Sequence, residues 1–379
     1  MSDYMNEDII DFDNDASASS FGWNFQANAG IFLFLHYIKD AKELKIESKL
    51  QDIEITLCNN NKILAQAKSA QDPSIDKAKK TKFKKALISI AKSSEKEPNA
   101  HFIYISNESD VFPSGDKAFD NCIQSYNGCL QSIKNEIDET IEATVNSISA
   151  KIKNTEKSSN DKETKQLIKM KHLIENLNKD NLSICCITRF WGEEENRYAS
   201  IKEKINDFLL TKLDYNPLLV QKISNKLFEH WSFECGFNST QKDIKKEISK
   251  ESFLWPISIF LLQDIHHDIT DCLDSTCDSS LAEEVDAIFE DGKMLYHERF
   301  EFSNKILQDY YDFKKNPVSK MKEPEKEFIM KNWKKYVEEF AQENFDEEKL
   351  EYVTKAFIYR ILMNSRNLRN ICSKVGIDK

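Results

Sequence analysis

The sequence predicts a small α/β domain followed by a mainly α-helical region. Three observations support this fold class. Only eight Gly and seven Pro occur in 379 residues, which favours long helices over an all-β fold with many turns. Up to about residue 110 the hydrophobic pattern has the order helix, three strands, helix, strand. From Ile201 onward only helical spacing recurs. We therefore divide the chain into residues 1–19, 20–190 and 191–379.

Composition predicts a soluble, cytosolic protein that is not embedded in a membrane. No run of eighteen apolar residues occurs, and the chain opens with acidic residues where a signal peptide needs a basic and then an apolar segment. The nine cysteines are too sparse for a disulfide scaffold and are expected to be reduced thiols.

The first 19 residues form an acidic tail. They contain six Asp or Glu and no Lys or Arg. The favoured interpretation is a flexible, solubilising tail. The alternative is a DNA mimic that covers a basic surface elsewhere in the chain.

A helix is predicted next, beginning near Ser19 or Ser20, either of which can cap it, and continuing to about His36. Three short β-type runs come after it. They are Leu44–Glu47, Asp52–Leu57 and Ile63–Lys68, with the turn of a hairpin at 58–62.

A Lys-rich amphipathic helix is expected over Lys77–Lys92, after a break at 72–76. His101–Ser106 forms another strand, and Leu182–Phe190 is a candidate for a further one. Within the helix, six lysines occur in nine residues, a density that suits phosphate binding or an ordinary solvated face. They are Lys77, Lys79, Lys80, Lys82, Lys84 and Lys85.

A long helical insertion is expected over about residues 116–179, and its two arms are separated by a polar break at Asn154–Lys162. Helical patterns then dominate the rest of the chain. The predicted helices are Ile201–Leu213, Leu218–Trp231, Thr240–Ser249, Leu281–Lys314, Glu325–Asn344 and Leu350–Cys372.

The hairpin carries the residues best suited to chemistry. Alternation along a strand places Asp52 and Glu54 on one face of the first strand, and Gln66 and Lys68 on one face of the second. If the two strands pair, carboxylates and an ammonium group meet at the sheet surface. This combination suits metal-dependent cleavage of phosphodiesters. The alternative is a cross-strand salt bridge of a few tenths of a kcal/mol.

Three separated segments resemble the PD-(D/E)xK nuclease superfamily. More narrowly, they look like the double-stranded DNA endonuclease domain of CD-NTase-associated effectors in bacterial antiphage systems. The segments are Phe21-Gly22-Trp23-Asn24-Phe25-Gln26, Glu47 with Asp52-Ile53-Glu54-Ile55, and Gln66-Ala67-Lys68. The resemblance covers residues 20–110, about a quarter of the chain, and implies a restriction-endonuclease-like fold.

The resemblance implies a role for each matching residue. Asp52 would be the principal ligand of Mg²⁺, for which Mn²⁺ can substitute, and Lys68 the catalytic lysine. Gln66 would occupy the second acidic position, where an amide still offers oxygen to the metal but no charge. Glu47 or Glu54 would complete the negative cluster, and Gln26 would contact a metal-bound water or a phosphate. The lysines of 77–85 would then contact the DNA backbone.

The resemblance also implies regulation. The helical half is similar to that of nuclease subunits that join a partner ATPase, either the SMC-like subunit of Lamassu systems or a HerA-like hexamer. Release or assembly by that partner would bring nuclease domains together as a homo-oligomer. No Gly-rich phosphate-binding motif occurs, so no nucleotide is expected to bind this chain.

Two other functions and one rival site compete with this interpretation. A nuclease fold without activity could serve as a scaffold, and the same metal chemistry could act on RNA or single strands. The rival is a zinc site formed by His266, His267, Asp268, Cys272 and Cys277, but their spacing fits no usual zinc motif.

Overall fold

The computed structural model describes residues 16–74, 78–108, 111–112, 119–157, 161–240, 247–263, 283–285, 287–289, 299–315, 323–340 and 345–377. Contacts divide the chain into two compact units. Unit 1 consists of Met1–Ile205 and Trp231–Ile248, and unit 2 of Asn206–His230 and Ser249–Lys379. The first unit thus extends past residue 190, where the sequence suggests a division, and takes up a later segment of the chain.

Unit 1 is built around a mixed sheet, as predicted. The sheet has seven strands in the order β5-β6-β4-β3-β2-β1-β7. The strands are β1 (Ala41–Ile46), β2 (Ile53–Leu57), β3 (Lys62–Lys68), β4 (His101–Ser106), β5 (Gln124–Ser125), β6 (Leu182–Cys186) and β7 (Ile248–Ser249). Strands β1, β2 and β3 pair antiparallel, whereas β3, β4 and β6 pair parallel.

The predicted hairpin is confirmed. Ile53 pairs with Ala65 and Ile55 with Ile63, and the turn closes with Leu57 N–H donating to the Asn61 carbonyl at 2.8 Å. Two strand ends differ from the prediction, because Glu47 comes after the end of β1 and Asp52 precedes the start of β2. Neither acidic residue takes part in the regular ladder.

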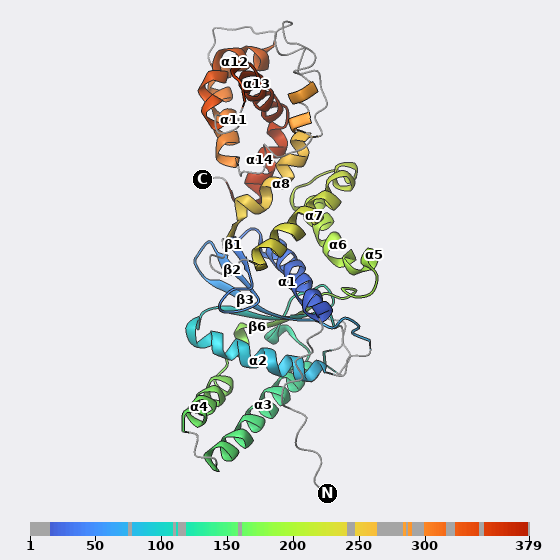
Figure 1. The fold of residues 1–379 in the computed structure, drawn as a ribbon, viewed down its shortest axis with the longest axis vertical. Coiled ribbons are helices and arrows are strands. Elements are labelled where there is room, and N and C mark those ends of the chain that lie inside the picture. Colours follow the sequence, from blue (N-terminus) through green and yellow to red (C-terminus); the bar gives the residue numbers. More distant parts are fainter. Residues whose placement is uncertain are drawn as a thin grey trace. The chain divides into compact units, whose positions relative to one another are not determined.

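Helices cover both faces of this sheet (Figure 1). Helix α1 (Ala16–Tyr37) packs closely on β1 at Gly30, where an added Cβ would require the end of the Ile46 side chain to shift. The predicted cap at Ser19 or Ser20 is wrong, because the helix begins at Ala16 and both serines lie inside it. Helix α2 (Lys79–Lys96) covers the opposite face.

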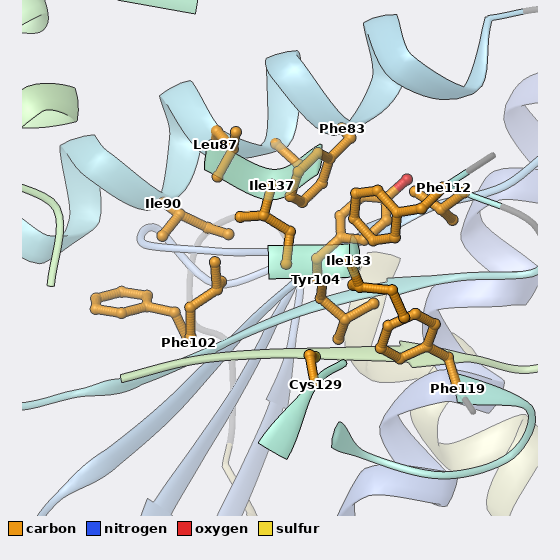
Figure 2. Packing of buried hydrophobic residues seen from close by; sticks show 14 of the residues in the cluster. Phe83, Leu87, Ile90, Phe102, Tyr104, Phe112, Phe119, Cys129, Ile133 and Ile137 are labelled. Carbon is orange, nitrogen blue, oxygen red and sulfur yellow. The ribbon is translucent and has the colours of Figure 1, made fainter. Parts of the chain in front are cut away.

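The core beneath α2 is largely aromatic. Phe83 packs edge to face against Tyr104 of β4 and against Phe112, with ring centroids 4.9 and 5.3 Å apart. Figure 2 shows Leu87 and Ile90 continuing this apolar side of α2 toward Phe102. The spacing of 83, 87 and 90 explains why a helix so rich in lysine folds, since every turn buries one large apolar side chain.

The insertion between β4 and β6 forms two long helices, as expected. Helix α3 (Gln131–Lys157) and helix α4 (Asp161–Glu175) pack on each other and on α2 through a second apolar cluster around Ile148 and Ile174. The helices continue into both ends of the predicted polar break. Short 3₁₀ turns at Tyr126–Gly128 and Lys179–Asn181 flank the pair.

The segment after β6 corrects two predictions. The strand ends at Cys186 and does not reach Phe190, and the helix predicted over Thr240–Ser249 does not extend to Ser249, because Ile248–Ser249 forms β7. Residues 241–246 of that prediction lie outside the described ranges. The helices here are α5 (Glu194–Arg197), α6 (Ala199–Asp207) with a π-helical extension at Phe208–Lys212, and α7 (Pro217–Thr240).

The described part of unit 2 is mainly helical, as predicted. It contains α8 (Lys250–Gln263), α11 (Phe300–Lys315), α12 (Pro324–Asn332), a 3₁₀ segment (Trp333–Phe340), α13 (Glu347–Met363) and α14 (Ser365–Val375). The sequence analysis missed α8. It also expected one helix where α13 and α14 are separated at Asn364, and an α-helix where Trp333–Phe340 is 3₁₀. Phe302, Phe340 and Phe357 form an aromatic core.

Further expectations concern the cysteines, membrane-spanning segments and residues outside the described ranges. The seven cysteines that the structure describes are all free thiols. Among the described helices, none is long and apolar enough to span a bilayer. Residues 1–15 of the acidic tail, Lys77 and the candidate zinc residues of 266–277 lie outside the described part.

Candidate active site

Asp52 lies where the pairing of β2 and β3 ends. The residue after it, Ile53, pairs with Ala65, which places Asp52 beside Gln66 on the neighbouring strand. Its Oδ2 accepts hydrogen bonds from the Ala67 N–H at 2.8 Å and from Gln66 Nε2, and lies 4.0 Å from Lys68 Nζ. The Asp52 carboxylate thus accepts from the Ala67 N–H in place of a backbone carbonyl of the neighbouring strand. Because side chains alternate along β3, Gln66 and Lys68 lie on the same face, next to this carboxylate.

The charge on Asp52 is poorly solvated. Burial raises the pKa of this carboxyl from 3.8 to about 6, and the nearby Glu47 adds to the rise. The Lys68 ammonium and the hydrogen bonds from Ala67 and Gln66 act in the opposite direction but do not cancel the effect of burial. A cation bound at Asp52 would relieve this cost, because it would stabilise the ionised form directly.

Glu47 is the second acid of the site. It adopts a left-handed backbone conformation with φ of 56°, and its N–H donates to the Asp52 carbonyl at 2.6 Å. The intervening loop is held by Ser48, whose hydroxyl donates to the Gln51 carbonyl and accepts from the Gln51 N–H. This tight loop returns Glu47 to the neighbourhood of Asp52.

Glu54 faces a different group of charges. Its carboxylate pairs with Lys62 Nζ at 3.1 Å, and Lys62 also contacts Glu97 at 2.8 Å. Lys62 begins β3 beside the turn, so the Glu54 carboxylate, two residues after Asp52, is ion-paired with a lysine at the turn end of the hairpin. Of the two acids that the sequence leaves open, the structure therefore brings Glu47, and not Glu54, to Asp52.

Gln26 is not joined to this group by any hydrogen bond in the described structure. It lies on α1, whereas Gln66 and Lys68 share the face of β3 that carries Leu64, which packs in the core under α2. Its Oε1 is buried and accepts no hydrogen bond from the residues that the structure describes. A contact between Gln26 and a metal-bound water or phosphate remains an untested prediction.

The lysines of α2 divide into two kinds. Lys82 contacts the fully buried Glu108 at 3.1 Å and donates to the Ser69 carbonyl at 2.9 Å, so it supports the chain beside Lys68 and is not presented to solvent. Lys80 and Lys85 are exposed, and Lys79 and Lys84 are half-buried. Of these, Lys80, Lys84 and Lys85 form no ion pair with described residues, which leaves their charge available.

The sequence analysis missed Glu108. It lies two residues beyond β4, and the intervening Asn107 holds the Ala70 and Phe190 carbonyls at 2.7 and 2.8 Å. The signal in the sequence is a carboxylate directly after a buried strand, at the edge where parallel strands end. That position is a common place for functional groups in α/β sheets.

The donor set suits a hard divalent cation. The Asp52 and Glu47 carboxylates and the Gln66 amide supply oxygens only, and Mg²⁺ commonly keeps several waters and takes few protein ligands. Within the described ranges, no group of three His, Cys, Asp or Glu side chains is placed to hold a metal. A metal ion held here would therefore also need the Gln66 amide oxygen, and the amide would have to turn, because its nitrogen now faces Asp52.

Comparison of the chain with protein families, with curated proteins and with solved structures finds no match. The geometry around Asp52, together with the motif resemblance, is thus the basis for assigning a function.

Proposed function

We propose that this chain is a metal-dependent phosphodiesterase, a DNA endonuclease of the PD-(D/E)xK type. One observation supports it most directly. Asp52, Gln66 and Lys68 meet where β2 and β3 stop pairing, and the Asp52 carboxylate is buried without full compensation of its charge. A structural salt bridge alone would not need a second acid, Glu47, close enough to raise the pKa of the same carboxylate.

Each residue has a role in this proposal. Asp52 and Glu47, with the Gln66 amide oxygen, would hold Mg²⁺ or Mn²⁺, and the bound ion supplies a Lewis acid and an acidified water. Lys68 Nζ lies at the outer limit of contact with Asp52, at 4.0 Å, and is 31% exposed. The ammonium can therefore reach a phosphate oxygen or the attacking water and stabilise the charge that develops there.

Duplex DNA is the proposed substrate. Lys80, Lys84 and Lys85 provide positive charge on α2, the helix that comes after β3 and its catalytic lysine. Such contacts bind phosphates regardless of base sequence, so binding should weaken steeply as salt is added. The acidic overall charge of −11 makes a local basic surface of this kind necessary.

We further propose that a partner ATPase, SMC-like or HerA-like, controls the nuclease in an antiphage defence complex and that the active form is a homo-oligomer. The support is the resemblance to nuclease subunits of such systems. A mainly helical unit 2, distinct from the unit that holds Asp52, is the proposed docking region.

The test is cleavage of plasmid and linear duplex DNA by the purified full chain with Mg²⁺, Mn²⁺ or EDTA. We expect metal-dependent cleavage that Lys68→Ala and Asp52→Ala both abolish. Lys62→Ala is the matched control, because Lys62 lies on the same strand but at the other end of the hairpin, paired with Glu54. Cleavage that persists in EDTA, or that Lys68→Ala leaves intact, would contradict the proposal.

A second candidate function is an inactive nuclease fold that acts as a scaffold. The observation that favours it is Gln66, a neutral residue at an acidic position, whose amide nitrogen binds the carboxylate that should hold metal. This candidate predicts no cleavage and no Mg²⁺ binding by the natural chain. Gln66→Glu would then restore metal binding, whereas in an active enzyme the natural Gln66 already suffices.

A further inference from the structure

Unit 2 contains a polar cleft of about 1260 Å³. Its walls come from the loop before α7, from α11 and from α14, so all of its lining residues belong to one unit. Charged, aromatic and amide side chains from all three segments face the cleft. Among them are Asp214, Tyr215, Asn304, Tyr311, Arg366 and Arg369.

The charge of the cleft is positive. Arg366 and Arg369 form no ion pair with residues of the described ranges, whereas the one lining carboxylate, Asp214, is neutralised by Lys374 at 2.6 Å. The first turn of α14 also lines the cleft, and the amino-terminal end of a helix favours negative charge. An anionic ligand therefore matches the cleft better than a cationic or an apolar one.

A buried tyrosine forms part of the cleft wall. Tyr215 is 6% exposed, and its phenolic oxygen makes no hydrogen bond with the residues that the structure describes. Because that oxygen has no accessible surface, the side chain shapes the wall of the cleft and its hydroxyl is turned away from a ligand there. Burial raises the pKa of this phenol, so it stays protonated.

An aromatic ring and several amides complete the lining. The Arg369 guanidinium lies 3.9 Å from the centroid of the Tyr311 ring and forms a flat stacked pair with it. Asn304, Gln308 and Asn367 add amide groups, which offer both donors and acceptors. A guanidinium group can bind a phosphate, a flat surface can stack against an aromatic ring, and amides can hydrogen-bond to the edge of that ring. All three occur together in this cleft.

We propose that this cleft binds a nucleoside phosphate. Arg366 and the start of α14 hold the phosphate, and the base stacks against the pair formed by Tyr311 and Arg369. A volume above the usual range for small-molecule pockets, about 300–1,000 Å³, accommodates a ligand of this size. The absence of a Gly-rich phosphate motif excludes only the binding modes that use such a motif. This site is independent of the nuclease proposal.

The test is equilibrium binding of ATP, AMP and inorganic phosphate to the full chain by calorimetry. EDTA is present throughout, so that no metal can recruit phosphates to Asp52. We expect saturable binding of ATP or AMP, tighter than that of phosphate. Arg366→Ala/Arg369→Ala should weaken it by about tenfold or more. Arg189→Ala/Lys334→Ala is the matched control, because it removes two exposed positive charges outside the cleft and should leave the affinity unchanged.

Arg366→Lys guards against variants that fail to fold. Keeping the positive charge but removing the planar guanidinium should leave the melting temperature of the free protein unchanged and still weaken nucleotide binding. Three outcomes would overturn the proposal: no saturable binding of either nucleotide, equal binding by the double-arginine variant, and inorganic phosphate or duplex DNA binding through these arginines in preference to nucleotides.

Discussion

Replacing Asp52 with Asn should make the metal-free protein more stable at neutral pH. The rise in the pKa of Asp52, from 3.8 to about 6, corresponds to about 3 kcal/mol at about 1.4 kcal/mol per unit. Asn keeps an oxygen that can accept from the Ala67 N–H but loses the attraction to Lys68, 4.0 Å away. We therefore expect a gain of about 1–2 kcal/mol in the free energy of unfolding.

The pH dependence of this stability gain shows whether the buried charge of Asp52 causes it. Between about pH 4 and about pH 6 the folded state retains the Asp52 proton that the unfolded state has released, so wild-type stability falls as the pH rises through this window. The advantage of Asp52→Asn should therefore be absent below about pH 4 and complete above about pH 7.

Urea unfolding of both proteins in EDTA across this range measures the effect. Repeating it with Mg²⁺ should stabilise the wild type alone, because the proposed site needs the Asp52 carboxylate to hold the ion. A variant less stable than wild type at neutral pH, or an advantage that does not change with pH, would refute the reasoning.

Two further predictions separate residues that look alike in the sequence. Glu47→Gln should lower Mg²⁺-dependent cleavage by about tenfold or more, whereas Glu54→Gln should leave the cleavage rate unchanged, because Glu54 is ion-paired with Lys62. Lys82→Met should destabilise the protein by about 3–5 kcal/mol, because it removes the ammonium group that pairs with the buried Glu108 carboxylate at 3.1 Å. Adding Glu108→Gln should recover much of that loss in urea unfolding, and a pair that behaves additively would contradict this account.

The grouping of Asp52, Gln66 and Lys68 could be predicted because it depends only on residues within one hairpin. Strict alternation in residues 52–57 and the short turn at 58–62 predict the hairpin, whose register places Asp52 beside Gln66. The choice between Glu47 and Glu54 could not be made in the same way. It depends on a left-handed backbone at Glu47, a conformation that a sequence without Gly or Asn at that position does not signal.

Long-range burial explains other differences between sequence and structure. Lys82 resembles its neighbours in the lysine run, and only Glu108, 26 residues away, distinguishes it. Helix α8 was missed because Phe253, Leu254, Trp255 and Ile257 bury it on all sides, which removes the polar face that periodicity detects. Pro256 inside the helix argues against it further.

The two ends of the β2–β3 hairpin differ in how fully their charges are compensated. Lys62, beside the turn, forms an ion pair with Glu54. At the other end, Glu47 holds a left-handed conformation that costs about 1–3 kcal/mol, and its charge raises the pKa of a carboxylate already destabilised by burial. Stability alone would remove such costs, since Gly at position 47 or Asn at position 52 relieves them. Their concentration at one strand end, beside Lys68, is explained if a divalent cation bound there offsets them.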